Sequence, residues 1–168
     1  PGSNIFPYIK KYLDDIITAE DDELIVAFLD MVENHKMIVE NSGLLTVAAL
    51  KHLGVKDKRV VSILSGGNMD VITMSSVVQQ GLIFRDRIFT VSVLLPDKPG
   101  ELAKVSQTLA DVQGNVIKLE HNPFVTTNRS AAVELRITLE CFGTEHKELI
   151  IAALEKKGYK PRIVRTMI

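Results

Sequence analysis

The chain has 168 residues, of which 46% are hydrophobic and 24% are charged, and its formal net charge is −1. This composition is typical of a globular protein with one or two small cores, and it excludes binding to nucleic acid or anionic membranes through overall charge. The single cysteine, Cys141, excludes a disulfide framework and a cysteine-based zinc site within the chain, and it is typical of a cytoplasmic protein. No apolar run approaches the ~20 residues that a membrane helix needs.

The first third of the chain is predicted to be helical. Residues 5–13 carry apolar side chains at helical spacing. A second helix follows Thr18, which can cap it, and ends near residues 34–36. Residues 40–53 are apolar on most sides of a third helix, so we expect this helix to be deeply buried.

A different pattern follows, in which a strand leads through glycines into a helix. Residues 59–64 form a continuous, mainly β-branched run that is typical of a parallel strand buried on both faces. The run ends in a glycine loop at residues 65–68, and a helix from Asp70 to about Gln80 follows. This order of elements places backbone N–H groups where they can bind a ligand. The boundary between the two halves of the chain is predicted near residues 81–87.

The second half alternates between strands and helices. The predicted elements are a strand (89–96), a tight turn (97–100), a helix closed by residues 113–115, two strands (116–121 and 131–141), a helix that starts at 144 or 145 and stops at 158, and a last strand (159–168). The resulting order, β-α-β-β-α-β, is the ferredoxin-like arrangement.

The segment from Phe89 to His121 resembles the opening half of an ACT domain, a small module that binds amino acids and regulates metabolic enzymes. The resemblance rests on the strand, the Asp-Lys-Pro-Gly turn, the helix, the Gly114-Asn115 turn and the second strand at their usual spacing. It implies that free N–H groups of the first turn receive the carboxylate of an amino acid effector. The start of the second strand, often from a neighbouring subunit, supplies partners for the amine. The implied effector-binding residues are Asp97, Pro99, Gly100, Glu101, Leu102, Asn115, Val116 and Ile117.

The stretch VVSILSGGNMD, preceded by VENSGLLTVAAL, resembles the end of the catalytic domain of threonine dehydratases and serine racemases. These are pyridoxal-phosphate lyases of the tryptophan-synthase β fold. Ser42 and Gly43 fit the family pattern, whereas Leu44 replaces its usual alanine. The resemblance places the Ser65 hydroxyl against the pyridine nitrogen of the cofactor. Because a hydroxyl cannot fully protonate this nitrogen, the cofactor is a moderate electron sink, which suffices for the elimination of water. The implied cofactor-binding residues are Ser65, Gly66, Gly67 and Asn68.

The same resemblance identifies two family motifs that this sequence does not contain. They are the S-x-K-x-R segment, whose lysine forms the Schiff base, and the glycine-rich loop that holds the cofactor phosphate. No catalytic residue is therefore assigned in this chain, and we expect the chain alone to be inactive. The four histidines are scattered, so no metal site is predicted.

Together the resemblances imply an α/β protein in two parts. Residues 1–82 are expected to be the C-terminal part of a tryptophan-synthase-β-like pyridoxal-phosphate domain, and residues 83–168 a ferredoxin-like ACT regulatory domain. The whole would be a cytoplasmic threonine dehydratase that forms 2-oxobutanoate and ammonia, binds isoleucine or valine as effector, and assembles as a homo-oligomer through ACT pairing.

Two alternatives stay open from the sequence. The chain can be a stand-alone amino-acid-binding ACT module, or a ferredoxin-like interaction domain without a ligand. The identity of the effector is open as well, because a biosynthetic enzyme predicts an amino acid whereas a catabolic one predicts a nucleotide.

Overall fold

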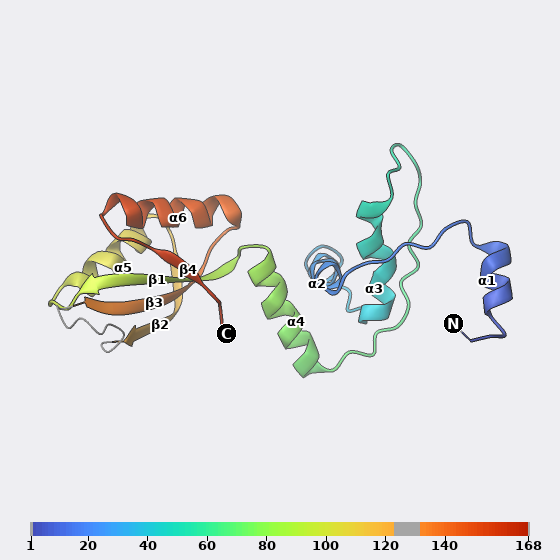
Figure 1. The fold of residues 1–168 in the computed structure, drawn as a ribbon, viewed down its shortest axis with the longest axis horizontal. Helices are drawn as coiled ribbons and strands as arrows, with labels where there is room; N and C mark the ends of the chain where they lie inside the picture. Colours follow the sequence, from blue (N-terminus) through green and yellow to red (C-terminus); the bar gives the residue numbers. More distant parts are fainter. Residues whose placement is uncertain (1, 123–131, 168) are drawn as a thin grey trace. The chain divides into compact units, whose positions relative to one another are not determined.

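A computed structural model describes residues 2–122 and 132–167 of the chain and divides it into two compact units, residues 1–78 and 79–168. The helix α4 (Val71–Phe84) contains this division, which lies close to the predicted boundary after residue 82 (Figure 1). None of the helices in the described residues combines the length and hydrophobicity that crossing a bilayer requires.

The first unit is built from helices, as predicted. They are α1 (Phe6–Tyr12), α2 (Asp21–Asp30) with the π-turn η1 (Met31–His35), and α3 (Asn41–Ala48) with the 3₁₀ turn η2 (Ala49–His52). The core of the unit forms where α2 and α3 bury Phe28 and Leu44, and Met74, Val77 and Val78 of α4 pack against them. No residue of α1 is buried.

Two details of the first unit differ from the sequence prediction. The residue that caps α2 is Glu20 and not Thr18, because Glu20 and Glu23 form a capping box in which each side chain meets the backbone of the other. The helix predicted over residues 40–53 ends at Ala48 and is buried on one side only, since Leu45 and Leu50 remain 44% and 40% exposed.

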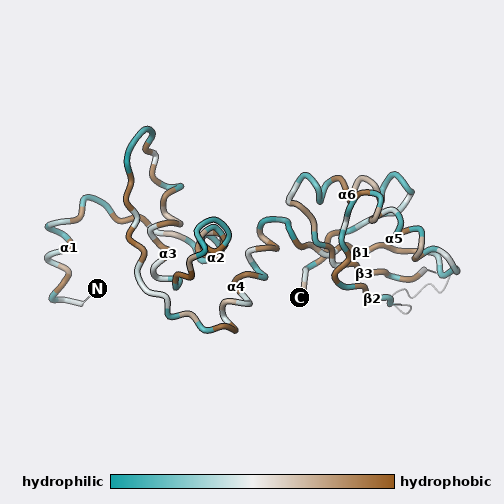
Figure 2. The backbone as a smooth tube through the Cα atoms, turned by 180° about the vertical axis from the view of Figure 1, so that it is seen from behind, coloured by the Kyte–Doolittle hydropathy of each residue, from teal (hydrophilic) through white to brown (hydrophobic). Residues whose placement is uncertain are grey.

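The strand predicted over residues 59–64 is wrong in this structure, because the segment has no regular secondary structure. Val61 is 88% and Ile63 73% exposed, and the apolar segment stands out in the hydropathy colouring of Figure 2. A parallel strand needs neighbouring strands to bond its N–H and C=O groups and to cover both faces. The described residues of the first unit contain no strand, and the segment is held by bonds such as Thr46 Oγ1 to the Ile63 carbonyl, 3.0 Å, and by packing of Leu64 against the core.

The second unit has the predicted β-α-β-β-α-β order. Its elements are β1 (Ile88–Pro96), α5 (Glu101–Asp111), β2 (Asn115–Asn122), β3 (Ala132–Glu140), α6 (Thr144–Lys156) and β4 (Arg162–Val164). The sheet is antiparallel with strand order β2-β3-β1-β4, so β2 and β4 are its edges. The last strand is much shorter than predicted. Ala131 and the loop 123–130 lie outside the described residues.

One face of this sheet carries the core. Both helices lie on this side of the sheet (Figure 1). Val91 and Val93 of β1 lie opposite Ile137 and Leu135 of β3, and all four are fully buried. The inward-facing residues of β3 are therefore those that the alternation predicted, within the described part of the strand. The core also contains Val105 and Leu109 from α5 and Ile150 and Leu154 from α6.

The opposite face of the sheet is polar. Thr90 and Thr138 hydrogen bond across the strands at 3.0 Å, and the Ser92 hydroxyl donates to Glu134 Oε1 at 2.6 Å. Arg136 Nε lies 3.2 Å from Glu134 Oε2. Such a face does not offer the continuous apolar surface that a second hydrophobic layer would need.

The helices α4, α5 and α6 end in the same way, in a Schellman motif. In each, one residue has the left-handed conformation, and the next N–H bonds back to a carbonyl five residues earlier. The left-handed residues are Asp86 (φ 53°), Gln113 (φ 60°) and Gly158 (φ 88°). The bonds are Arg87 N to Leu82 O at 2.8 Å, Gly114 N to Leu109 O at 2.9 Å, and Tyr159 N to Leu154 O at 3.2 Å.

Gly114 therefore closes α5 for a reason other than backbone conformation. The left-handed position belongs to Gln113. A Cβ on Gly114 would lie 3.3 Å from Ile150 Cδ1 of α6 and 3.4 Å from the Leu109 carbonyl. The absence of a side chain at Gly114 lets the start of β2 pack closely against α6.

Candidate functional site

The glycine loop at residues 65–68 wraps around the carboxylate of Glu40. The Asn68 N–H donates to Glu40 Oε2 at 3.1 Å, and the Ser42 hydroxyl donates to Oε1 at 2.6 Å. These bonds, the Ser42 bond first, lower the pKa of Glu40. A Cβ on Gly66 would lie 2.3 Å from Glu40 Cδ and would displace this carboxylate, and the φ of 78° favours glycine at this position.

A second close approach joins the loop to the start of α3. A Cβ on Gly43 would lie 2.0 Å from the Ser65 carbonyl oxygen and 2.7 Å from Val39 Cγ1. The Glu40 N–H donates to the Gly66 carbonyl at 3.3 Å. The structure thus brings together the two segments that carry the resemblance to the dehydratases, residues 39–43 and 65–68.

The loop residues Ser65, Gly66, Gly67 and Asn68 are exposed, but the helix that follows offers fewer donors than predicted. Asp70 Oδ1 accepts the N–H groups of Ile72 and Thr73 at 3.0 and 2.9 Å. The bond from the Thr73 hydroxyl, followed by these two backbone bonds, lowers the pKa of Asp70. The first turn of α4 is therefore capped by its own chain, and a ligand at this loop would meet the loop backbone and the Ser65 side chain.

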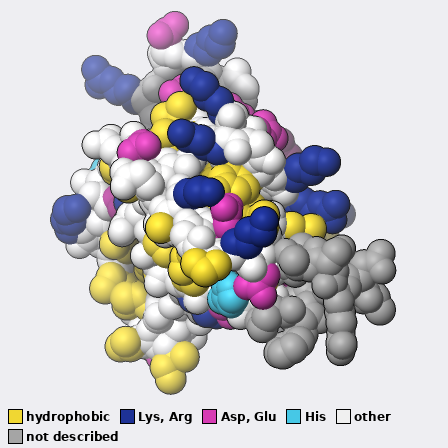
Figure 3. All heavy atoms as spheres, turned by 90° about the vertical axis from the view of Figure 1, so that its left-hand side faces the viewer, with side chains coloured by type: hydrophobic (Ala, Val, Ile, Leu, Met, Phe, Trp, Pro, Cys, Tyr) yellow, Lys and Arg dark blue, Asp and Glu magenta, His cyan; other side chains and the backbone are white. Residues whose placement is uncertain are grey.

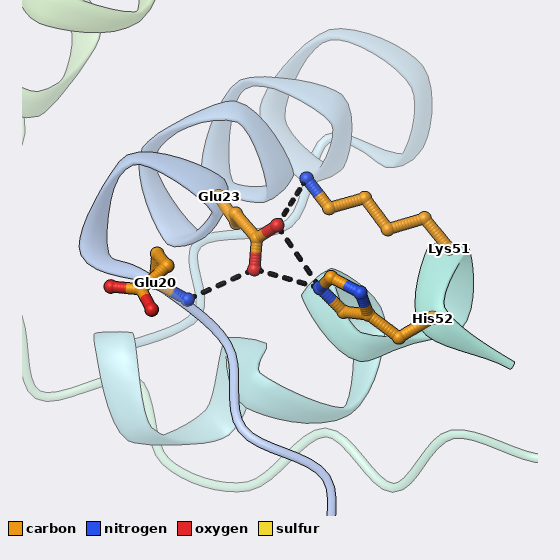
Figure 4. A network of polar contacts seen from close by, with 4 residues as sticks. All are labelled: Glu20, Glu23, Lys51 and His52. Atoms are coloured by element: carbon orange, nitrogen blue, oxygen red, sulfur yellow. Dashed lines mark hydrogen bonds and ion pairs between the residues drawn. The ribbon is translucent and has the colours of Figure 1, made fainter.

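Glu23 has the most strongly lowered pKa among the described acids of the first unit, and its contacts join two helical elements. Glu23 contacts Lys51 Nζ at 2.6 Å, His52 Nε2 at 3.0 Å and the Glu20 N–H at 2.9 Å (Figure 4). The His52 bond, then those of Lys51 and Glu20, lower the pKa of Glu23 from 4.5 to about 2. The cluster ties α2 to η2.

In the second unit, the first predicted effector element is the turn before α5. Gly100 is the N-cap residue of α5 with φ 91°, and no side chain caps this end, so Asp97 does not serve as the cap. Residues 97–100 are exposed, and nothing lies within 4 Å of a Cβ built on Gly100. Glu101 instead pairs with Lys104 at 2.7 Å, and Leu102 is exposed. The turn therefore presents an open helix N-terminus.

The second predicted effector element is the start of the edge strand β2. Asn115, Val116 and Ile117 are exposed, and Asn115 Nδ2 donates to Glu140 Oε2 at 3.0 Å. The register shifts between Val116 and Lys118, which leaves Ile117 as the extra residue of a β-bulge.

The two elements do not meet within one copy of the chain. Gly100 precedes α5 and Asn115 follows it, and a helix of 11 residues is roughly 16 Å long. This distance exceeds the size of a single amino acid.

Comparison with known proteins explains the geometry of the second unit. Residues 89–158 match the family model of the ACT domain. This part of the chain is an ACT domain. The family assignment agrees with the four-stranded antiparallel sheet and with the two helices on one side of it.

The similarity to other proteins extends beyond the ACT domain. The chain is 35% identical to an L-threonine ammonia-lyase of Geobacter sulfurreducens over 161 residues, which is 95% of this chain and 40% of that protein. It is 32% identical to an L-threonine ammonia-lyase of Thermotoga maritima over 98% of the chain and 41% of that protein. It is 27% identical to the L-threonine dehydratase biosynthetic IlvA of Escherichia coli over 94% of the chain and 30% of that protein. The chain is thus homologous to the C-terminal region of these enzymes and spans about two fifths of the first two.

Sequence reasoning missed two residues that the structure makes prominent. Glu40 holds the glycine loop, and its position two residues before the matching Ser42-Gly43 pair could have revealed it. Asp86, next to the ACT domain, contacts the first turn of α6 through Thr144 and Lys147. Only its place between two arginines marked it in the sequence.

Proposed function

We propose that this chain carries the effector-binding part of a cytoplasmic, pyridoxal-phosphate-dependent threonine ammonia-lyase, which converts L-threonine to 2-oxobutanoate and ammonia. The observation that supports this most is the 35% identity to the Geobacter sulfurreducens ammonia-lyase over 95% of the chain. A stand-alone ACT module would explain similarity over residues 89–158 but not over the first unit.

The ligand of the ACT domain is proposed to be isoleucine or valine. The N-terminus of α5 has no side-chain cap, and unpaired N–H groups with the helix dipole favour a carboxylate there. Val116 and Ile117, 39% and 46% exposed, offer apolar contacts to an aliphatic side chain. At the end of the unit where β1 leads into α5, hydrophobic side chains lie between Lys and Arg side chains (Figure 3). This mixture suits a small ligand with an anionic and an apolar part.

The complete effector site is proposed to need two copies of the ACT domain. Because α5 separates Gly100 from Asn115, one amino acid can contact both elements only if each comes from a different copy. The strand β2 is an exposed edge of eight residues, and such an edge readily pairs with another chain. Side-by-side pairing would bring Asn115 of one copy towards Gly100 of the other.

In the first unit, Ser65, Gly66, Gly67 and Asn68 would face the ring of pyridoxal phosphate. The residues fit this group, because the loop is exposed and Gly66 and Gly67 carry no side chain that would cover its backbone. When bound, the cofactor supplies an electron sink for the elimination of water. Ser65 would provide a neutral hydrogen-bond partner, and Glu40 would hold the loop that orients it. Since the S-x-K-x-R motif does not occur in this sequence, we expect no release of 2-oxobutanoate from threonine by the chain itself.

Calorimetric titration of the 168-residue chain with L-isoleucine, L-valine and adenosine monophosphate tests the effector. We expect one of the two amino acids to bind and the nucleotide not to bind. Gly100→Val should abolish binding, because a β-branched side chain at φ 91° strains the turn and crowds the carboxylate. Gly158→Val is the matched control, since Gly158 also has positive φ and open space around it but lies away from the turn.

The results of this titration separate the three interpretations of the chain. Full binding by Gly100→Val would move the ligand site away from the turn. Binding of no amino acid by the unmodified chain would favour the ligand-free interaction domain. Sedimentation equilibrium with and without the amino acid tests pairing, and a strictly monomeric species at high concentration would contradict the shared site.

A further inference from the structure

The first turn of α6 makes side-chain contacts to two segments that are far apart in the sequence. Thr144 and Lys147 contact Asp86, which follows α4. His146, from the same turn, contacts Val112 at the end of α5. One helical turn of α6 therefore contacts both the residue that follows α4 and the residue that ends α5, just before the second effector element.

The Asp86 contact is short and bidentate. Lys147 Nζ lies 2.6 Å from Asp86 Oδ1, and the Thr144 hydroxyl donates to Oδ2 at 2.9 Å. The Cys141 thiol donates to the Asp86 carbonyl at 2.7 Å, and the Cys141 N–H donates to the Arg87 carbonyl at 2.8 Å. The residues directly after α4 are thus fixed to the ACT domain by both side chain and backbone.

Asp86 occupies a position where helices usually have glycine. It is the left-handed residue of the Schellman motif, φ 53°, and α6 uses Gly158 at the same place. A non-glycine residue there carries a conformational cost, which glycine would avoid. The Asp86 carboxylate makes two bonds to α6 that glycine could not make, and these bonds connect the end of α4 to α6.

The His146 contact fixes the other side of the turn. His146 Nδ1 accepts the Phe142 N–H at 3.0 Å, so its Nε2 carries the proton and donates to the Val112 carbonyl at 2.6 Å. Val112 is the C-cap residue of α5 and lies three positions before Asn115 in the sequence. Gly114, between them, packs closely against Ile150 of the same helix α6.

We propose that the first turn of α6 couples the effector site to the end of α4, with Asp86 and His146 as positioning residues on its two sides. The proposal rests on the proposed function for its ligand, but the connection itself is a property of the described residues. A displacement of residues 112–117 on effector binding would move α6, and the Asp86 bonds would carry this displacement to residues 84–88. Adjacency alone does not establish coupling, so the test must measure reciprocal effects.

Hydrogen–deuterium exchange of the whole 168-residue chain, without ligand, measures the connection directly. Asp86→Gly removes the carboxylate and keeps a residue suited to the left-handed position, so it should raise exchange at residues 112–116 by about fivefold, the lower end of typical coupling between sites. His146→Leu should raise exchange at residues 84–88 to a similar degree. Glu148→Gln, an exposed change on the same helix, should alter neither segment.

A second variant keeps the test decisive if Asp86→Gly unfolds. Lys147→Met removes the cation but leaves Asp86 and the backbone in place, and it should raise exchange at residues 112–116 in the same direction. If each variant changes exchange only around its own site, the coupling is wrong.

A ligand arm separates this proposal from the proposed function. With L-isoleucine or L-valine, the unmodified chain should show slower exchange at residues 97–117 and also at 84–88. Asp86→Gly should bind the amino acid with an unchanged affinity and keep the first effect, but lose the second. Failure of the unmodified chain to bind either amino acid would overturn the proposed effector, whereas the arm without ligand would still decide the coupling.

Discussion

The two units of this chain differ in whether their apolar segments find strand partners and cover within the same unit. In the ACT domain, each core strand has a partner within the same unit, and Val91, Val93, Leu135 and Ile137 are fully buried. In the first unit, Val61 and Ile63 belong to an equally apolar segment but remain exposed and irregular. The comparison teaches that apolar, β-branched residues form a strand only where other strands bond to their backbone and cover their faces.

Alanine substitutions in the two segments test this contrast with the largest expected effect. Leu135→Ala should lower the free energy of unfolding of the ACT domain by about 2–5 kcal/mol, because it leaves a cavity in a fully buried core. Val61→Ala should change stability by no more than about 0.5 kcal/mol, since its side chain is already in water. Urea denaturation measures both. A cost for Val61→Ala that approaches that of Leu135→Ala would show that the apolar segment of the first unit is packed in solution.

A smaller effect is expected where the first unit is tightly packed, at its glycine loop. Gly43→Ala places a Cβ 2.0 Å from the Ser65 carbonyl, so the loop or α3 must shift, at a cost of about 1–3 kcal/mol. Gly54→Ala is the control, because nothing lies within 4 Å of its Cβ and its φ is not positive. Thermal unfolding together with exchange at residues 65–68 measures the difference. Equal behaviour of the two variants would mean that the loop does not contact α3 as described.

The smallest effect is expected on the pH dependence of stability, to which the first unit contributes through Glu23. Its pKa falls from 4.5 to about 2 on folding, so the unfolded chain takes up this proton first as the pH drops. The stabilisation is fully present above about pH 4.5 and disappears as the pH falls through about 2. Glu23→Gln should therefore destabilise the chain at pH 6 and lose most of this difference near pH 2.5. Unfolding midpoints of both proteins across this range provide the measurement, and a difference that does not change with pH would contradict it.

The sequence predicted the ACT domain well because its information is local. The alternation in residues 89–96 and 132–140, the turn before Gly100 and the glycines after α5 and α6 each define an element whose partners lie in the same unit. The predictions failed where a distant group decides the outcome. Residues 59–64 lack strand neighbours, and Thr18 is displaced as a cap by the Glu20–Glu23 pair.

The candidate sites show the same division. The glycine loop and the segment at residues 39–43 were identified from their residues, and they do pack together. Glu40 and Asp86 were given no role, because their importance depends on contacts 28 and 58 or more residues away. A single sequence does not reveal such pairs through its local pattern.

The bulge at Ile117 changes which residues of β2 face the helices after this point in the strand. Val116 lies opposite Leu139 on the helix side, Lys118 opposite Thr138 on the polar side, and Leu119 opposite Ile137 on the helix side again. If Ile117 paired regularly with Thr138 and made no bulge, Lys118 would lie opposite Ile137 on the helix side and Leu119 opposite Arg136 on the polar side, because a shift of one residue exchanges the two faces of a strand. Asn115 can therefore follow α5 directly while Leu119 stays on the helix side of the sheet. Deletion of Ile117 would therefore remove the bulge but keep every later side chain of this strand on its present face, because Lys118 would still lie opposite Thr138.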